Sequence, residues 1–116
     1  MNILKESRQR IKAQLDEWRE KLGIPADKRI IGAVGRFIPL KGFDHFIRAG
    51  IEQLKKRGDV CFVLAGDGPS RGRYEDMVKE YGAEDGFRIL GWQENTAALI
   101  KSFDVFVLPS INEGMG

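Results

Sequence analysis

The sequence is poor in the residues that form covalent or metal-mediated cross-links. It has one cysteine, Cys61, and one histidine, His45, among 116 residues. A single cysteine excludes an internal disulfide and is typical of a reducing compartment, so we expect a cytoplasmic protein. No cluster of histidine, cysteine and carboxylate residues has metal-ligand spacing, so we expect no metal site. Cys61 falls in an apolar run and His45 in an amphipathic one, which predicts a core thiol and a non-catalytic imidazole.

The sequence also lacks long apolar runs and a strong excess of either charge. Its longest apolar stretches have the length of single strands, so none predicts a membrane span. The N-terminus becomes charged at Lys5 and Glu6 and therefore has no apolar core of a signal peptide. The net charge is only +2, and no basic stripe with interleaved aromatics is present, which argues against a nucleic-acid partner.

What remains is an ordinary globular composition, 42% hydrophobic and 31% charged, in a chain long enough for one domain. We divide it into a leading helix with its linker, residues 1–26, and a domain, residues 27–116. Gly23 and Pro25 are placed to end a helix over residues 3–22. The helix is expected to pack on the domain, although an interaction helix or short coiled coil stays open. Its apolar stripe consists of Leu4, Ile11, Leu15, Trp18 and Leu22.

The domain alternates strands with helices, which is typical of an α/β fold with a parallel sheet. We expect a Rossmann-like sheet in the order 3-2-1-4, with the second strand central because it is apolar throughout. Ser70 is placed to cap a helix, and Tyr81 is expected on the apolar face of that helix. Arg88 is expected on the surface. Residues 105–108 are expected to form a strand that is buried on both faces. The predicted strands are 29–35, 60–66, 86–91 and 105–108, and the predicted helices are 43–57, 71–81 and 94–102.

Two cations lie in the predicted turn after the first strand. The turn reads Gly35-Arg36-Phe37-Ile38-Pro39-Leu40-Lys41-Gly42. Fixed cations stabilise a leaving diphosphate, and the N-terminus of the next helix adds positive potential. Arg36 and Lys41 are therefore candidate catalytic and phosphate-binding residues, with the backbone of Gly35 beside them. By themselves, two cations in a loop also fit an ordinary solvated turn.

Glycines and an aromatic residue follow the second and third strands. Gly66, Gly68 and Gly72 give a loose dinucleotide-binding pattern, but that fingerprint belongs after the first strand of such a fold. A tight turn that needs glycine is the plainer interpretation. Trp92 could stack on a base or pack against the domain.

The C-terminal stretch combines a carboxylate with flexible backbone. Glu113 is followed by Gly114, Met115 and Gly116, directly after an apolar strand and a Pro-Ser pair. Such a turn at the carboxyl end of a parallel strand forms a ligand edge, and glycines let backbone approach a ligand closely. Glu113 could accept hydrogen bonds from sugar hydroxyls, or it could be a surface carboxylate.

Taken together, these motifs resemble the donor-binding domain of GT-B glycosyltransferases of the group 1, retaining, family 4 type. The resemblance runs from about residue 22 to residue 116 and keeps the family's order of motifs. It implies that Arg36 and Lys41 bind the diphosphate of a nucleotide-sugar donor and that Gly66 and Gly68 lie near it. It further implies that the loop of Trp92 contacts the base, and that Glu113 with the backbone of residues 114–116 holds the donor sugar.

The resemblance also implies parts that the chain does not contain. A second glutamate, eight residues after Glu113 in the family, would lie past Gly116, as would the last strands. We therefore expect an engineered piece or a truncated copy of a hexosyltransferase-like enzyme, inactive alone, without its acceptor-binding N-terminal domain. Its acceptor is unknown, and peripheral attachment of the intact enzyme to a membrane stays open. An exposed sheet edge predicts self-association. Alternatives are a non-catalytic nucleotide-binding or interaction module and, less well supported, a nicotinamide-dependent oxidoreductase fragment.

Overall fold

The computed structural model describes residues 3–108; the first two residues and 109–116 lie outside the described part. The described chain forms one parallel four-stranded sheet in the order β3-β2-β1-β4, as predicted. The predicted and observed bounds of each helix and strand differ by at most two residues at either end. The elements are α1 (Ile3–Leu22), β1 (Arg29–Val34), η1 (Pro39–Lys41), α2 (Phe43–Lys56), β2 (Val60–Ala65), α3 (Arg71–Glu80), η2 (Glu84–Gly86), β3 (Phe87–Leu90), α4 (Thr96–Lys101) and β4 (Val105–Phe106).

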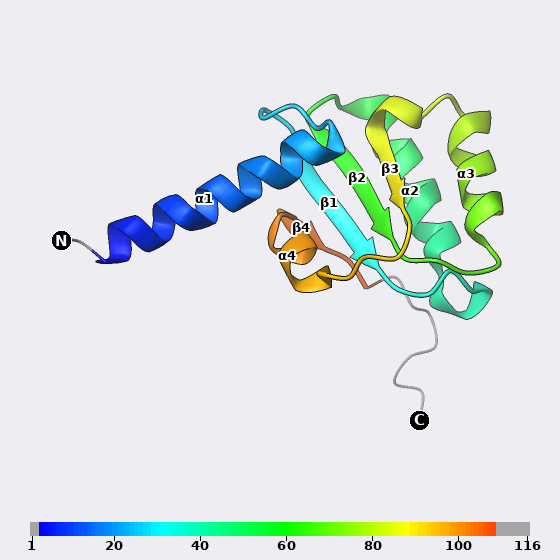
Figure 1. Cartoon of the computed structure of the whole chain (residues 1–116). Coiled ribbons are helices and arrows are strands. Elements are labelled where there is room, and N and C mark those ends of the chain that lie inside the picture. The colour runs from blue at the N-terminus through cyan, green and yellow to red at the C-terminus, as the bar shows by residue number, and fades with distance from the viewer. Residues whose placement is uncertain (1–2, 109–116) are drawn as a thin grey trace.

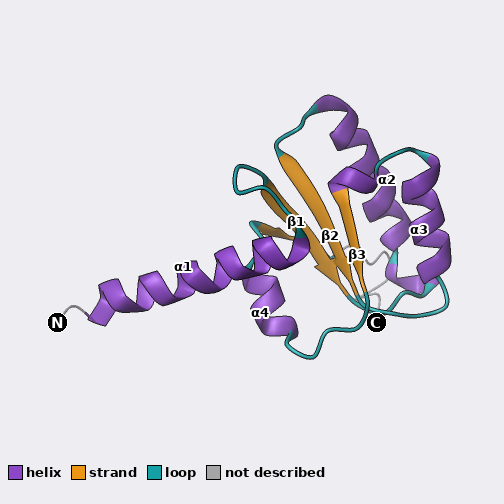
Figure 2. Ribbon diagram, turned by 45° about the horizontal axis from the view of Figure 1, so that its top comes forward, coloured by secondary structure: helices purple, strands orange, loops and turns teal. Residues whose placement is uncertain are grey.

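Helices cover both faces of the sheet, which explains why β2 is apolar at every position. Figure 2 shows α2 and α3 on one face, and α4 with the end of α1 on the other. Alternate residues of a strand point to opposite faces. Val60, Phe62 and Leu64 accordingly pack in the cluster under α2 and α3. The intervening Cys61, Val63 and Ala65 pack with Leu22, Ile24 and Leu99. Cys61 is thus a core residue, as predicted, and its burial raises the pKa of the thiol.

The end of α1 is fixed to the domain, while its beginning projects away from the sheet (Figure 1). Trp18, Leu22 and Ile24 join the core of this face. The predicted packing is therefore confirmed for the last turns of the helix. Residues 8–10 and 12–14 are exposed, so an interaction role for that part of α1 stays open. The division of the chain at residues 26 and 27 remains a prediction.

Two arginines hold α1 in place through main-chain oxygens. The Arg19 guanidinium donates to the Lys28 carbonyl (2.6 Å) and to the Asp104 carboxylate (3.2 Å), which also accepts from the Ile30 N–H (2.6 Å). Arg88 donates to the carbonyls of Leu22 (2.7 Å) and Gly23 (3.0 Å) at the C-terminus of α1. These carbonyls have no partner within the helix, so a cationic donor there both satisfies and stabilises the helix end.

Four expectations about single elements were wrong. Arg88 is not a free surface residue, since it binds the end of α1. Ser70 precedes α3, but its side chain makes no cap hydrogen bond. Tyr81 is exposed rather than packed, because α3 ends at Glu80 and the chain turns away at Gly82. The strand expected over residues 105–108 comprises only β4, and both of its residues are exposed.

Candidate functional site

Three loops meet where the parallel strands β1, β2 and β3 end. Residues 35–42 follow β1, residues 66–70 follow β2 and residues 91–95 follow β3. Because all strands run in the same direction, these loops lie at one edge of the sheet. This carboxyl edge is where open α/β sheets bind ligands. It is therefore the candidate functional site of the chain.

Phe37 anchors the loop that carries the two predicted cations. Its side chain is fully buried and packs edge-on against Phe43 and Tyr74, with ring centroids 5.8 and 5.4 Å away. The backbone is fixed as well: the Phe37 N–H donates to the Asp67 carbonyl (3.0 Å), and its own carbonyl accepts from the Ser70 N–H (3.0 Å). Sequence reasoning missed Phe37. The available signal was an aromatic residue directly after Arg36 in a loop with a glycine at each end.

The two cations lie at opposite ends of this anchored loop. Arg36 is exposed, directly before Phe37, while Lys41 is partly exposed in η1, directly before α2. Gly42 ends η1 in the left-handed conformation (φ 72°) and leads into α2, whose first N–H groups face the same edge. The only acidic residue in the first turn of α2, Asp44, forms an ion pair with Arg73, which offsets its charge. The loop thus carries one cation near each end, beside the N-terminus of α2.

Gly66 and Gly68 are the positions at which the loops interlock. Both have positive φ, 148° and 154°. A Cβ on Gly66 would lie 1.8 Å from the Gly35 carbonyl oxygen, and one on Gly68 would lie 2.7 Å from the Phe37 carbonyl oxygen. Glycine is therefore required here for close packing of one loop on another. This observation favours the tight-turn interpretation and leaves any ligand contact of these glycines a prediction.

Trp92 is exposed in the loop after β3, with 71% of its surface accessible. The packed alternative is thus wrong for the described chain. Beside it, the Arg71 guanidinium lies 3.0 Å from the point where a Cβ on Gly91 would lie, and forms an ion pair with Glu75 (3.1 Å). Arg71 therefore borders the same edge, although no sequence motif singled it out.

Glu113, Gly114, Met115 and Gly116 lie outside the described residues. Among residues 3–108, no group of three or more histidine, cysteine or acidic residues could hold a metal ion. No helix of the described part is long and apolar enough to cross a membrane.

A carboxylate with a lowered pKa, Asp59, lies at the opposite edge of the sheet. Arg57 and Asp59, in the turn before β2, form a two-bond ion pair with both distances 2.6 Å. The hydrogen bond from Arg57 lowers the pKa of Asp59 to about 2. This pair stabilises a surface turn and does not belong to the candidate site.

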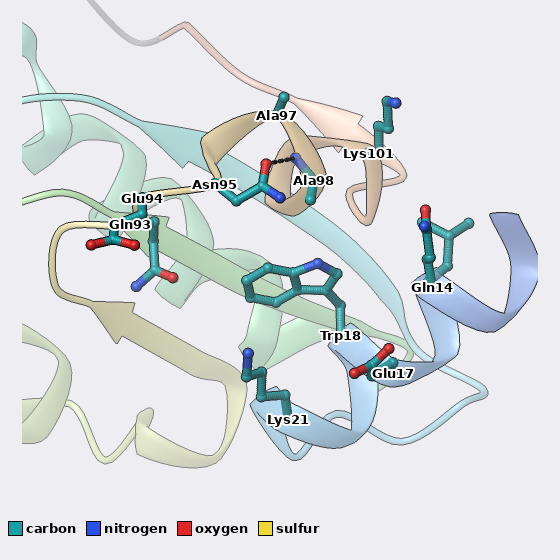
Figure 3. Close-up of a pocket in the computed structure, with 11 residues that line it drawn as sticks. Gln14, Glu17, Trp18, Lys21, Gln93, Glu94, Asn95, Ala97, Ala98 and Lys101 are labelled. Carbon is teal, nitrogen blue, oxygen red and sulfur yellow. Dashed lines mark hydrogen bonds between the residues drawn. The ribbon is translucent and has the colours of Figure 1, made fainter. Parts of the chain in front are cut away.

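A separate groove of about 700 Å³ lies between α1 and the segment that contains α4. Figure 3 shows the Trp18 indole between the two walls. The other lining residues are Gln14, Leu15, Glu17, Lys21, Gln93, Glu94, Asn95, Ala97, Ala98 and Lys101. The groove lies on the α1 and α4 face of the sheet and shares no residue with the loops after β1 and β2.

A parallel sheet with interlocked glycine loops at its carboxyl edge defines the Rossmann-like class of α/β domains. Within that class, the model of the family "Glycosyl transferases group 1" matches residues 14–116. The chain therefore belongs to the group 1 glycosyl transferases, as its motifs predicted.

Curated relatives agree with this assignment. The chain is 37% identical over 98 residues to the lipopolysaccharide core biosynthesis glycosyltransferase LpsD of Rhizobium meliloti, covering 84% of the chain and 27% of LpsD. It is 39% identical over 101 residues to the putative glycosyltransferase EpsF of Bacillus subtilis, covering 86% of the chain and 26% of EpsF. The chain thus spans about a quarter of the length of the curated relatives it matches.

Solved structures show the same fold. The C-terminal domain of a group 1 glycosyl transferase, LpcC from Francisella tularensis, superposes with a TM-score of 0.74 at 30% identity, over 89% of the chain and 56% of that domain. Anabaena HepE in complex with UDP and glucose superposes with a TM-score of 0.71 at 22% identity, over 84% of the chain and 27% of HepE. The predicted Rossmann-like fold of GT-B enzymes is confirmed.

Proposed function

We propose that the chain supplies the diphosphate-binding part of a nucleotide-sugar site in a retaining, family 4 type hexosyltransferase. One observation carries the proposal: Arg36 is an exposed cation on a loop that Phe37 fixes to the carboxyl edge of a parallel sheet. Family membership and the UDP-bound relative HepE support it.

Each residue of the edge has a distinct role in this proposal. Arg36 offers a planar fork to two phosphate oxygens, and Lys41 a point charge, so that both stabilise the diphosphate as the glycosyl bond breaks. The N-terminus of α2 adds positive potential. Trp92 and the backbone of its loop border the base. Glu113 and the N–H groups of residues 114–116 orient the donor sugar, and no metal is required for donor binding because these cations neutralise its charge.

Binding of UDP and GDP to the isolated chain tests this proposal. We expect a Kd no tighter than about 1 mM, because solvent-exposed phosphate contacts alone give little net affinity. In amide NMR spectra, the signals of Gly35, Arg36 and Gly66 should shift, whereas those of Arg57 and Asp59 at the opposite edge should not. We expect no transfer from UDP-sugar or GDP-sugar donors, since these 116 residues span only about a quarter of the length of the curated relatives.

The control is the Arg36→Ala, Lys41→Ala chain, in which the UDP-dependent shifts at the edge should vanish. Equal shifts in both chains, or shifts confined to other surfaces, would contradict the diphosphate site. Binding well below 1 mM, or turnover, would instead contradict the expected weakness of the isolated chain.

The exposed sheet edge predicts association between copies of the chain. In the described part, β4 pairs only with β1. Val105, Phe106 and Leu108 are 51%, 44% and 71% exposed, and an apolar edge strand is a template for pairing. We expect dimers or larger species whose fraction increases with concentration in sedimentation velocity. Phe106→Lys should restore the monomer, whereas Tyr81→Lys, which replaces an exposed aromatic away from the edge, should not. A wild-type chain that stays monomeric at high concentration would contradict this expectation.

A further inference from the structure

The groove between α1 and α4 has the chemistry of a carbohydrate site. We propose that it binds a short neutral oligosaccharide, stacked on Trp18 and hydrogen-bonded by the surrounding amides and carboxylates. The groove shares Gln93, Glu94 and Asn95 with the loop after β3, but no residue with the loops after β1 and β2 that carry the proposed diphosphate site. Its volume, about 700 Å³, falls within the range of small-molecule sites, roughly 300–1,000 Å³.

Trp18 provides the apolar platform. Its indole lines the groove while part of the residue packs against the core under α1 and α4. Lys21 holds the ring from one side, with its Nζ 4.9 Å from the ring centroid. The C–H face of a pyranose is apolar and packs on an aromatic ring, whereas its hydroxyls need polar partners. A single indole flanked by alanines matches one such face better than it matches an extended lipid chain.

The polar lining matches hydroxyl groups. Gln14, Gln93 and Asn95 each carry an amide, which both donates and accepts hydrogen bonds as a hydroxyl does. The charged residues cancel: Glu17 and Glu94 contribute two negative charges, and Lys21 and Lys101 two positive charges. A neutral, hydroxyl-rich ligand fits this balance, whereas a polyanion would gain no net attraction.

Hydrogen bonds hold the α4 wall of the groove before any ligand binds. The Gln93 side chain donates to the Gly91 carbonyl (3.1 Å), and the Asn95 side chain accepts from the Ala98 N–H (3.2 Å). The Thr96 hydroxyl donates to the Gln93 carbonyl (3.1 Å). Two of the three amides are therefore oriented by the fold.

Arg19 and Arg88 fix the α1 wall through the contacts described above. Neither wall must move to form the groove. A ligand consequently loses less free energy to ordering of the protein than it would in a site formed on binding.

The two tryptophans of the chain make the test specific. In proton–nitrogen NMR spectra each indole N–H gives one signal, and a Trp92→Phe chain assigns them. Maltotetraose, cellotetraose and tetra-N-acetylchitotetraose are the probes. We expect at least one to shift the Trp18 signal saturably, with a Kd of about 1 mM, and to leave the exposed Trp92 signal unchanged.

Matched variants connect the shift to the groove. Ala98→Arg places a long side chain in the groove and should weaken binding about tenfold, whereas Ala49→Arg, the same change on the exposed surface of α2, should not affect it. Gln93→Ala is the smaller variant, to be used if Ala98→Arg disturbs folding. It removes one amide and should weaken binding about threefold.

Four outcomes would overturn the proposal. The first is an unchanged Trp18 signal with all three sugars at roughly 20 mM. The second is equal binding by the Ala98→Arg and wild-type chains. The third is tighter binding of a sulfated, heparin-derived tetrasaccharide, which would contradict a neutral ligand. The fourth is a Trp18 shift that follows protein concentration without sugar, which would make a second copy of the chain the occupant.

Discussion

Replacing Arg36 and Lys41 together by alanine is expected to abolish glycosyl transfer in a full-length enzyme that carries this segment. A donor diphosphate gains negative charge as the glycosyl bond breaks, so the cations at the carboxyl edge contribute more in the transition state than in the ground state. Loss of one such group lowers kcat by about 10²–10³-fold, and the double loss should exceed about 10³-fold. Steady-state kinetics with the enzyme's own donor measures the effect.

Helix α2, which follows the loop, offers a control with the same loss of charge. Arg48→Ala with Lys56→Ala also removes two exposed cations, but from the body and the far end of α2. We expect this enzyme to keep its activity within about twofold, because exposed charges away from the edge are screened. If the chain is instead an interaction module, its function does not depend on these cations. Partner binding through α1 would then continue in the Arg36→Ala, Lys41→Ala protein. Similar kcat values for the two double variants would contradict the diphosphate role.

The fold followed from the sequence because its signals were local and redundant. The continuous apolar run of β2 fixed that strand as central, and the alternation of strands and helices fixed the parallel topology. One expectation failed because a side chain acts over a long sequence separation. Arg88 caps the C-terminus of α1 from 66 residues away, and no local pattern marks such a contact.

The loops that form the candidate site were predictable from the sequence. The contacts that hold these loops in place were much less predictable. The motifs placed Arg36, Lys41, Gly66, Gly68 and Trp92 in loops that the fold brings to one edge. They did not show that Phe37 fixes the first loop, because burial of a loop residue depends on Phe43 and Tyr74 from two helices. The motifs also did not show whether Gly66 and Gly68 allow a ligand to approach or allow the loops to pack. Both explanations require only that these positions have no side chain.

The interlocking of the loops predicts a large loss of stability for Gly66→Ala. The added methyl group would lie 1.8 Å from the Gly35 carbonyl oxygen, in a backbone with φ 148°. Strain and overlap together should destabilise the chain by about 3 kcal/mol or more and lower its Tm by about 10 °C. Thermal unfolding followed by circular dichroism measures the change.

Gly72→Ala is the matched control for that substitution. Gly72 lies in α3, and a Cβ there would meet no atom within 4 Å. Alanine is the better helix former, so this variant should gain up to about 1 kcal/mol. The two identical substitutions, six residues apart in the chain, should thus shift the Tm in opposite directions. A Gly66→Ala chain as stable as the wild type would mean that the loops after β1 and β2 separate easily, and the rigid support of Arg36 would then no longer hold.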